Sequence, residues 1–402
     1  MRFLLYIDPG TGSMLFTLAV GLVSVVWFGA RALFMKMKFF SPAAKKDRNK
    51  KNIVIYGEDK RYWTTFKGIL DEFERRRVKV TYLAGSADDP LLEKPYKYVE
   101  TEVIGLGNKA YAKLNFLNAR IVLATTPGLD VYQWKRSRNV DWYVHIPHMP
   151  GELTTYRMFA TDFYDALLLS GQYQVDDCRS LEHLRNLPEK ECAIVGVPYL
   201  DLMANRLRGM KTGTRENITV LVAPSWGDNS LLNRFGGRLF DALAATGYHI
   251  VVRPHPQSFI SEKELIDKLM RDYPQLEWNR DADNFDVLNR SDIMISDFSG
   301  VIFDFALVFD KPVICAYTDF DKSKFDAWWL DTPIWTATAI PRIGTVLSEE
   351  NLPDIKALVD SALEDKSNER RRQEVRDETW MHRGEGAARV VDYLVQKLRK
   401  LQ

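Results

Sequence analysis

Three polar segments, each directly after an apolar run, carry the side chains best suited to chemistry. They are "VVRPHP" with Arg253 and His255, "YVHIPHMPGE" with His145 and His148, and "SDFSGVIFDFALVFDKP" from Ser296 to Pro312. Arginine can bind phosphate oxygens through two parallel hydrogen bonds, and histidine can donate a hydrogen bond or transfer a proton. Together these residue types indicate a site for a ligand that carries phosphate.

The segment that begins at Ser296 has the features of an anion site at a helix start. We expect Ser299 to be the N-cap and Gly300 to let the backbone approach a ligand closely, with the hydroxyls of Ser296 and Ser299 as further donors. Asp304 cannot contact a phosphate favourably, so we predict that it accepts a hydrogen bond from a hydroxyl, for example of a sugar or glycerol. The alternative is that Ser299 only caps the helix and Asp304 is solvated.

Prolines flank the histidines of the other two segments, a setting more typical of a functional loop than of a core. We predict that Arg253 and His255 contact phosphate, and that His148 is a general base. His145, still within its strand, is predicted to be structural, although which of His145 and His148 is the base stays open. Two histidines three residues apart have no third ligand at a suitable spacing, so no metal site is predicted.

Two further patterns resemble functional motifs but have simpler explanations. "DAD" at Asp281 to Asp283 imitates a metal-binding DxD, but it precedes a short predicted helix, so a cap is the favoured interpretation. "LATTPGLD" could form an acceptor loop through Thr125 and Thr126, and a turn after a strand explains it equally well.

The elements around these segments predict two α/β domains with parallel, doubly wound sheets. Short apolar runs alternate with helical spacing from residue 52 to residue 200, a polar stretch follows, and the alternation restarts at residue 218, with one helix expected from Leu231 to Ala245. We expect a membrane anchor over residues 1–40, a first Rossmann-like domain over 41–205, a linker over 206–217, a second Rossmann-like domain over 218–385 and a C-terminal helix over 386–402. Such folds hold ligands at the carboxyl ends of their strands.

An apolar stretch from Gly12 to Phe34, with one charge at Arg31, is close to the length of a membrane-spanning helix. From Arg31 to Lys51 the charged residues are basic except for Asp47. The basic residues are Arg31, Lys36, Lys38, Lys45, Lys46, Arg48, Lys50 and Lys51. The positive-inside rule then predicts a retained single-pass anchor with everything after residue 35 in the cytoplasm.

Composition excludes some classes of function. The chain of 402 residues has 55 Lys and Arg against 54 Asp and Glu, which argues against a nucleic-acid partner bound through a global basic field. Its three cysteines, Cys178, Cys192 and Cys315, have no metal or disulfide spacing and are predicted to be free thiols.

The segments "RPHP", "SDFSGVIFDFALVFDKPVI" and "HRGEGAARVVDYL", with "DALLLSGQY" and "VGVPYLD", resemble the CDP-glycerol glycerophosphotransferase family, which includes wall teichoic acid primases and polymerases. The resemblance covers residues 50–395 loosely, and "YIDPGTGSM" is similar to a membrane-anchored bacterial branch. It implies a GT-B architecture, in which a first, acceptor domain faces a second, nucleotide-donor domain across a cleft. It also implies His148 as base, His255 at the pyrophosphate, and Ser296, Asp297, Ser299 and Gly300 under the phosphates. The family usually has Ser-Ser where this chain has Ser299-Gly300, and its polymerases have Trp-His-Gly-Thr-Pro where this chain has Pro147 to Gly151.

We therefore expect a transferase that moves glycerol phosphate from CDP-glycerol to a hydroxyl of a lipid-linked or glycan acceptor and releases CMP, without a metal or other cofactor. The resemblance implies the bacterial inner membrane as its location. One alternative is a GT-B glycosyltransferase or an epimerase that uses a nucleotide sugar. Another is a catalytically silent, membrane-anchored binding protein, in which His148 and His255 could be replaced without effect.

Overall fold

The structure is a computed structural model that describes residues 27, 50–210, 217–281, 283–316 and 321–402. The chain divides into two units, residues 1–50 and residues 51–402, and the second holds both sheets. Within the described ranges, no helix combines the length and apolar character that a membrane crossing requires. The predicted anchor and the middle of the predicted linker lie outside the described residues, so these expectations stay predictions.

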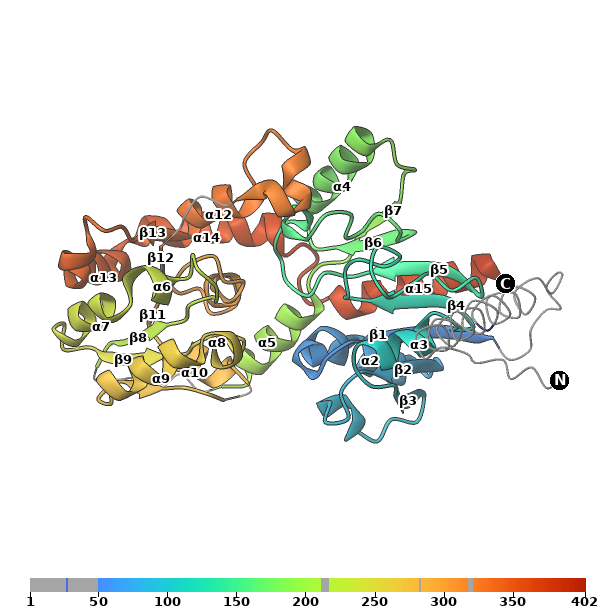
Figure 1. Ribbon diagram of the computed structural model, residues 1–402, viewed down its shortest axis with the longest axis horizontal. Coiled ribbons are helices and arrows are strands. Elements are labelled where there is room, and N and C mark those ends of the chain that lie inside the picture. The colour runs from blue at the N-terminus through green and yellow to red at the C-terminus, as the bar shows by residue number, and fades with distance from the viewer. Residues whose placement is uncertain (1–26, 28–49, 211–216, 282, 317–320) are drawn as a thin grey trace, which may run out of the picture. The chain divides into compact units, whose positions relative to one another are not determined.

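The first sheet has seven parallel strands in the order β3-β2-β1-β4-β5-β6-β7 (Figure 1). Its strands are β1 Lys51–Gly57, β2 Val80–Ala84, β3 Val99–Val103, β4 Ala119–Ala124, β5 Val140–His145, β6 Ala166–Leu169 and β7 Glu191–Ile194. The order reverses between β1 and β4, which is the point where doubly wound sheets bind ligands.

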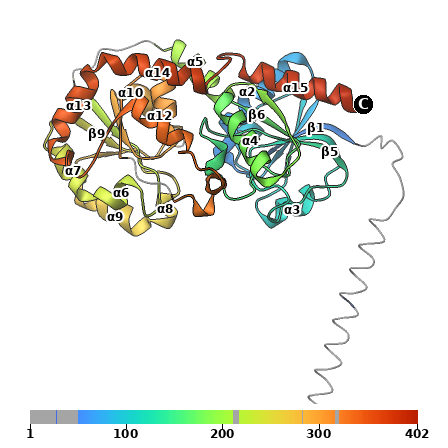
Figure 2. The same ribbon diagram turned by 90° about the horizontal axis from the view of Figure 1, so that it is seen from above.

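The second sheet has six parallel strands in the order β10-β9-β8-β11-β12-β13 (Figure 1). Figure 2 shows the helices that surround this sheet. Its strands are β8 Thr219–Val222, β9 His249–Val252, β10 Glu277–Trp278, β11 Ile293–Ser296, β12 Val313–Cys315 and β13 Gly344–Val346. Here the order reverses between β8 and β11. The predicted class, two parallel-sheet α/β domains, is confirmed.

Helices cover both faces of each sheet. The α-helices are α2 Trp63–Arg76, α3 Asn108–Leu114, α4 Gln172–Arg185, α5 Pro198–Arg208, α6 Leu231–Phe235, α7 Gly237–Ala244, α8 Ser258–Ser261, α9 Lys263–Asp272, α10 Phe285–Arg290, α11 Val301–Phe303, α12 Trp335–Ile343, α13 Ile355–Glu364, α14 Lys366–Thr379 and α15 Gly386–Leu401. A π-helical turn, η4 Asp304–Val308, continues α11. The 3₁₀ turns are η1 Lys60–Tyr62, η2 Pro90–Leu92, η3 Leu153–Thr155, η5 Lys322–Lys324, η6 Asp326–Trp329 and η7 Leu352–Asp354.

Each sheet has a separate apolar core on each face, because parallel strands in this arrangement are buried on both sides. In β1, Ile53 and Ile55 belong to one core, whereas Val54 and Tyr56 belong to the other. This alternation explains why the central strands are continuous apolar runs in the sequence, and the runs position the polar loops that follow them.

The C-terminal helix α15 returns to the first sheet, where it contacts β1, β4, α2 and α5. Val390, Val391 and Leu394 are fully buried in the core of that sheet. Asp201 of α5 holds the segment that leads into α15, because its carboxylate accepts hydrogen bonds from Trp380 Nε1 (2.9 Å), Gly384 N (2.6 Å) and Gly386 N (2.9 Å). Two of the stretches that resemble the family, around residues 195–201 and 382–394, therefore bind each other.

Three local features differ from the sequence expectations. The helix expected from Leu231 to Ala245 is broken at Gly236, whose φ of 52° and ψ of −133° lie outside helical geometry and favour glycine. The expected linker begins at residue 206, but α5 continues to Arg208. The edge strand β13 was not predicted, because its three residues are too short for a periodic pattern.

Candidate active site

The predicted site residues follow the carboxyl ends of strands in both sheets, and loops of the two domains meet. His148 follows β5, His255 follows β9 and the turn from Ser296 to Gly300 follows β11. A Cβ atom added to Gly300 would lie 3.5 Å from the sulfur of Met149, an ordinary van der Waals contact. The loop that carries His148 therefore lies close to the turn in the other domain that was predicted to hold phosphates.

Aromatic rings pack against His148, and no hydrogen bond to the described residues holds its ring. Its ring centroid lies 5.0 Å from that of Tyr62 and 6.4 Å from that of Tyr156. Its Nδ1 is buried and has no hydrogen-bond partner among the described residues, which leaves Nε2 as the atom that can meet a substrate. Burial, followed by the positive charge of Arg61, lowers the pKa of His148 from 6.5 to about 4, so the free imidazole is neutral at pH 7.

His145 is the last residue of β5 and is fully buried, with its ring 5.6 Å from that of Tyr156 and 5.0 Å from that of Tyr164. Burial, with a smaller effect of His148, lowers the pKa of His145 to about 3. A side chain without exposed surface cannot reach a substrate hydroxyl directly. The geometry thus favours His148 over His145 as a candidate base.

His255 is oriented as a hydrogen-bond donor. The backbone N–H of Gln257 donates to its Nδ1 at 3.1 Å, so the neutral ring carries its proton on Nε2. The ring of Trp226, an exposed residue in the loop after β8, lies 6.5 Å away. Burial, followed by the positive charge of Arg61, lowers the pKa of His255.

Arg253 holds a neighbouring loop in the same domain. Its guanidinium donates to Asn279 Oδ1 and, at 2.8 Å, to the carbonyl oxygen of Asp281. These contacts tie the end of β9 to the segment that follows β10. The predicted phosphate contact of Arg253 would have to use the part of the guanidinium that these bonds leave open.

Ser296 and Asp297 form the internal framework of the turn after β11. Both are fully buried: Ser296 donates to the carbonyl oxygen of Ala223 at 2.6 Å, and Asp297 accepts from the backbone N–H groups of Ser225, Leu231 and Ser299. These bonds fix the turn after β11 to the loop after β8, which is the opposite side of the switch point in the second sheet. Phe298, Ser299 and Gly300 are the members of the turn with exposed surface, and Phe298 is the most exposed of them.

The expectation that Ser299 is an N-cap is wrong. Gly300 takes the N-cap position, and no side chain caps this helix start. The reason is that Ser299 already belongs to the first turn, since its N–H donates to Asp297 and its carbonyl oxygen accepts from Ile302 N at 3.1 Å. The helix itself is short, three α-helical residues followed by the π-helical turn η4.

Asp304 is the first residue of η4, and its carboxylate accepts hydrogen bonds from Tyr199 Oη (2.8 Å) and from Asn284. Burial raises the pKa of Asp304 to about 7. Two protein donors thus already serve the carboxylate that was predicted to bind a substrate hydroxyl. Its contacts join η4 to α5 and to the start of α10.

Arg61 is the residue of this region that sequence reasoning missed. It lies in η1, directly after β1, and its charge acts on both His148 and His255. The only available signal was its position after the first strand, because "EDKRYW" otherwise has the composition of a solvated turn.

The two patterns with simpler explanations are structural in the fold. Asp283 accepts from Phe285 N at 3.0 Å, beside the start of α10, whose N-cap position is taken by Asn284. The hydroxyls of Thr125 and Thr126 are buried, so this turn does not present them as an acceptor loop. Across the described ranges, no group of three or more His, Cys, Asp or Glu side chains is arranged to hold a metal ion.

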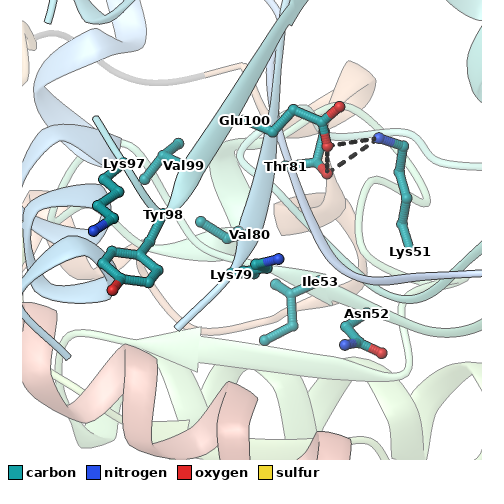
Figure 3. Close-up of a pocket in the computed structure, with 10 residues that line it drawn as sticks. All are labelled: Lys51, Asn52, Ile53, Lys79, Val80, Thr81, Lys97, Tyr98, Val99 and Glu100. Atoms are coloured by element: carbon teal, nitrogen blue, oxygen red, sulfur yellow. Dashed lines mark hydrogen bonds and ion pairs between the residues drawn. The ribbon is translucent and has the colours of Figure 1, made fainter. Parts of the chain in front are cut away.

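A pocket of about 430 Å³ lies at the opposite ends of the first-sheet strands (Figure 3). It is lined by residues at the beginnings of β1, β2 and β3, including Lys51, Val80 and Val99. Lys51 Nζ donates to Thr81 Oγ1 (3.2 Å) and Glu100 Oε2 (3.4 Å) there. Since the catalytic candidates all follow carboxyl ends of strands, this pocket is not part of their site.

Comparison with protein families matches residues 161–396, more than half of the chain, to CDP-glycerol:poly(glycerophosphate) glycerophosphotransferase. Among solved structures, a point variant of the wall teichoic acid polymerase TagF has 14% identity and a TM-score of 0.59, with 96% of this chain and 98% of that chain covered. TagF itself has 16% identity and a TM-score of 0.56, with 89% and 91% covered. A putative UDP-N-acetylglucosamine 2-epimerase from Listeria monocytogenes has 12% identity and a TM-score of 0.55, with 85% and 95% covered.

At such identities these structures show a shared GT-B-like fold alone. A search of curated protein sequences gave no match.

Proposed function

Because the chain belongs to the CDP-glycerol:poly(glycerophosphate) glycerophosphotransferase family and transfers glycerol phosphate from CDP-glycerol, we propose that His148 is the general base of that transfer and that His255 binds the donor. The proximity of Met149 to Gly300 carries this proposal, since it means that the loop with His148 in the first domain lies close to the turn from Ser296 to Gly300 in the second. The resemblance of "RPHP" and "SDFSG" to the family supports the same assignment.

In the proposed step, an acceptor hydroxyl gives its proton to Nε2 of His148. Its oxygen forms a bond to the glycerol-bearing phosphorus, the bond from that phosphorus to the bridging oxygen breaks, and CMP leaves with the electron pair. His255 donates from Nε2 to a phosphate oxygen, and the backbone at Ser299 and Gly300 faces the phosphates. Positioning and charge stabilisation supply most of the rate of such reactions.

The acceptor is proposed to be lipid-linked or glycan. The apolar stretch of residues 12–34 and the basic residues after it support a membrane anchor with the catalytic unit at the cytoplasmic face. An enzyme tethered there would share a surface with a lipid-linked acceptor.

The test is CMP release from CDP-glycerol by the detergent-solubilised full chain with a membrane lipid extract. We expect His148→Ala to lower kcat by about 10²–10⁴-fold, as for the loss of a general base, while calorimetry shows CDP-glycerol affinity within a few-fold of wild type. His255→Ala should lower both kcat and the affinity for CDP-glycerol. His183→Ala, at an exposed position of α4, is the matched control. A His148→Ala protein with wild-type kcat would remove His148 from the mechanism.

A further inference from the structure

Arg61 is held in one orientation by its neighbour Asp59. The carboxylate oxygen Oδ1 of Asp59 accepts from both the backbone N–H and Nε of Arg61, each at 2.9 Å. The Arg61 side chain is nevertheless 52% exposed. Among the described residues, no hydrogen bond or ion pair occupies its Nη1 or Nη2, so the outer edge of the guanidinium is presented to solvent.

Arg61 is near His148 through Tyr62, and its charge also reaches His255. Tyr62, the next residue, packs its ring against that of His148, and the Arg61 guanidinium carbon lies 5.8 Å from the centre of the Tyr62 ring. Arg61 also lowers the pKa of His148 in its own domain and of His255 in the other domain. One cation therefore acts electrostatically on an imidazole from each domain.

The outer nitrogens of Arg61, which Asp59 does not occupy, are suited to bind an anion. A guanidinium with two open nitrogens, together with the Nε2–H of His255, can bind several phosphate oxygens at once, since arginine offers parallel N–H donors. No carboxylate of the described residues pairs with the outer edge. Met149, the residue after His148, lies close to Gly300, so the turn from Ser296 to Gly300 is near the loop that carries this histidine.

We propose that Arg61 binds the pyrophosphate of CDP-glycerol between His148 and His255. This inference rests on the proposed function and adds to it a cationic contact from the first domain to the donor, which otherwise is bound by the second. During transfer the guanidinium would stabilise the charge that accumulates on the bridging oxygen as its bond to the glycerol-bearing phosphorus breaks. The bound anion would also offset the field of Arg61 on His148 and so make that imidazole a stronger base.

The experiment is calorimetric titration of the full chain with CDP-glycerol, CMP, cytidine and inorganic pyrophosphate. For Arg61→Ala we expect affinity for CDP-glycerol and for pyrophosphate to fall by about 10- to 100-fold, the range for a lost charge-assisted hydrogen bond, with cytidine affinity unchanged. Arg61→Lys keeps the positive charge but not the parallel N–H donors of the guanidinium, so it should lose less affinity than Arg61→Ala. Arg75→Ala is the matched control, because Arg75 is also exposed (69%) and paired with one neighbouring acid.

Equal affinities of wild type and Arg61→Ala for CDP-glycerol and pyrophosphate would overturn the inference, as would an equal loss for cytidine. A different outcome is that wild type binds pyrophosphate more tightly than Arg61→Ala does, while wild type does not bind CDP-glycerol. That outcome would contradict CDP-glycerol as the donor and would still support an anion site at Arg61. Thermal unfolding of each variant separates loss of binding from loss of structure.

Discussion

The loops that form the candidate site are held by different forces in the two domains. In the second domain, hydrogen bonds fix the turn after β11, with Asp297 accepting from three backbone N–H groups and Ser296 donating to Ala223. In the first domain, aromatic rings pack around His148, and its buried Nδ1 makes no hydrogen bond to the described residues.

Hydrogen bonds depend steeply on distance and angle, whereas ring contacts tolerate small shifts. The difference suits a rigid platform for one nucleotide donor and an adaptable loop for the acceptor.

Removing the carboxylate of Asp297 should cause the largest loss of stability. In Asp297→Ala, three backbone N–H groups, two of them buried, lose their acceptor, and we expect the free energy of unfolding to fall by about 4 kcal/mol. Urea unfolding measures this change. Asp286→Ala, at a side chain that is 72% exposed, is the control and should stay within about 0.5 kcal/mol of wild type. If the two variants unfold alike, the second-domain turn is not held by Asp297.

Acid should weaken the first domain through its buried histidines. Burial lowers the pKa of His145 from 6.5 to about 3, so between these values the unfolded chain binds a proton that the folded chain does not. The stability that this histidine contributes is complete above pH 6.5 and is lost as the pH falls below it, at about 1.4 kcal/mol per pH unit. His148, with a pKa of about 4, adds to the same trend.

Urea unfolding at pH 7 and pH 5 tests this expectation. His145→Gln cannot titrate, so its loss of stability between the two values should be smaller than that of wild type by about 2 kcal/mol. His183→Gln, exposed on α4, should keep the wild-type difference. A pH dependence that His145→Gln leaves intact would mean that His145 is already charged in the folded protein.

Introducing at Gly300 the serine that is usual in the family should have the smallest effect on stability and on the affinity for CDP-glycerol. Gly300 has φ −57° and ψ −21°, and a Cβ there would make ordinary contact with Met149, so we expect Gly300→Ser to fold within about 0.5 kcal/mol of wild type. The added hydroxyl should tighten CDP-glycerol binding by about threefold, measured by calorimetry against Gly209→Ser as control. Weaker binding would show that the turn accommodates the donor only without a side chain.

The sequence predicts the sheets well because the central parallel strands are buried on both faces and so form apolar runs. It also predicts where polar loops follow the strands, because proline, histidine and serine come directly after those runs in "VVRPHP", "HIPHMP" and "SDFSG". It does not distinguish framework from ligand contact: Ser296 and Asp297 have the same residue types as an anion site, yet their polar atoms bond to distant backbone. Arg61 was missed because its relation to two histidines, 87 and 194 residues away, exists only in three dimensions.

The return of α15 to the first sheet has a consequence for the order in which the protein folds during its synthesis. Domains commonly fold as they leave the ribosome, beginning with the one nearest the N-terminus. Here the first core lacks Val390, Val391 and Leu394 until the last 16-residue helix has been made, and each such side chain contributes about 1.5–3 kcal/mol when buried. The first domain is therefore expected to remain incomplete while the whole of the second is translated. A chain that stops before residue 386 would leave the apolar face of the first domain that α15 covers exposed to solvent.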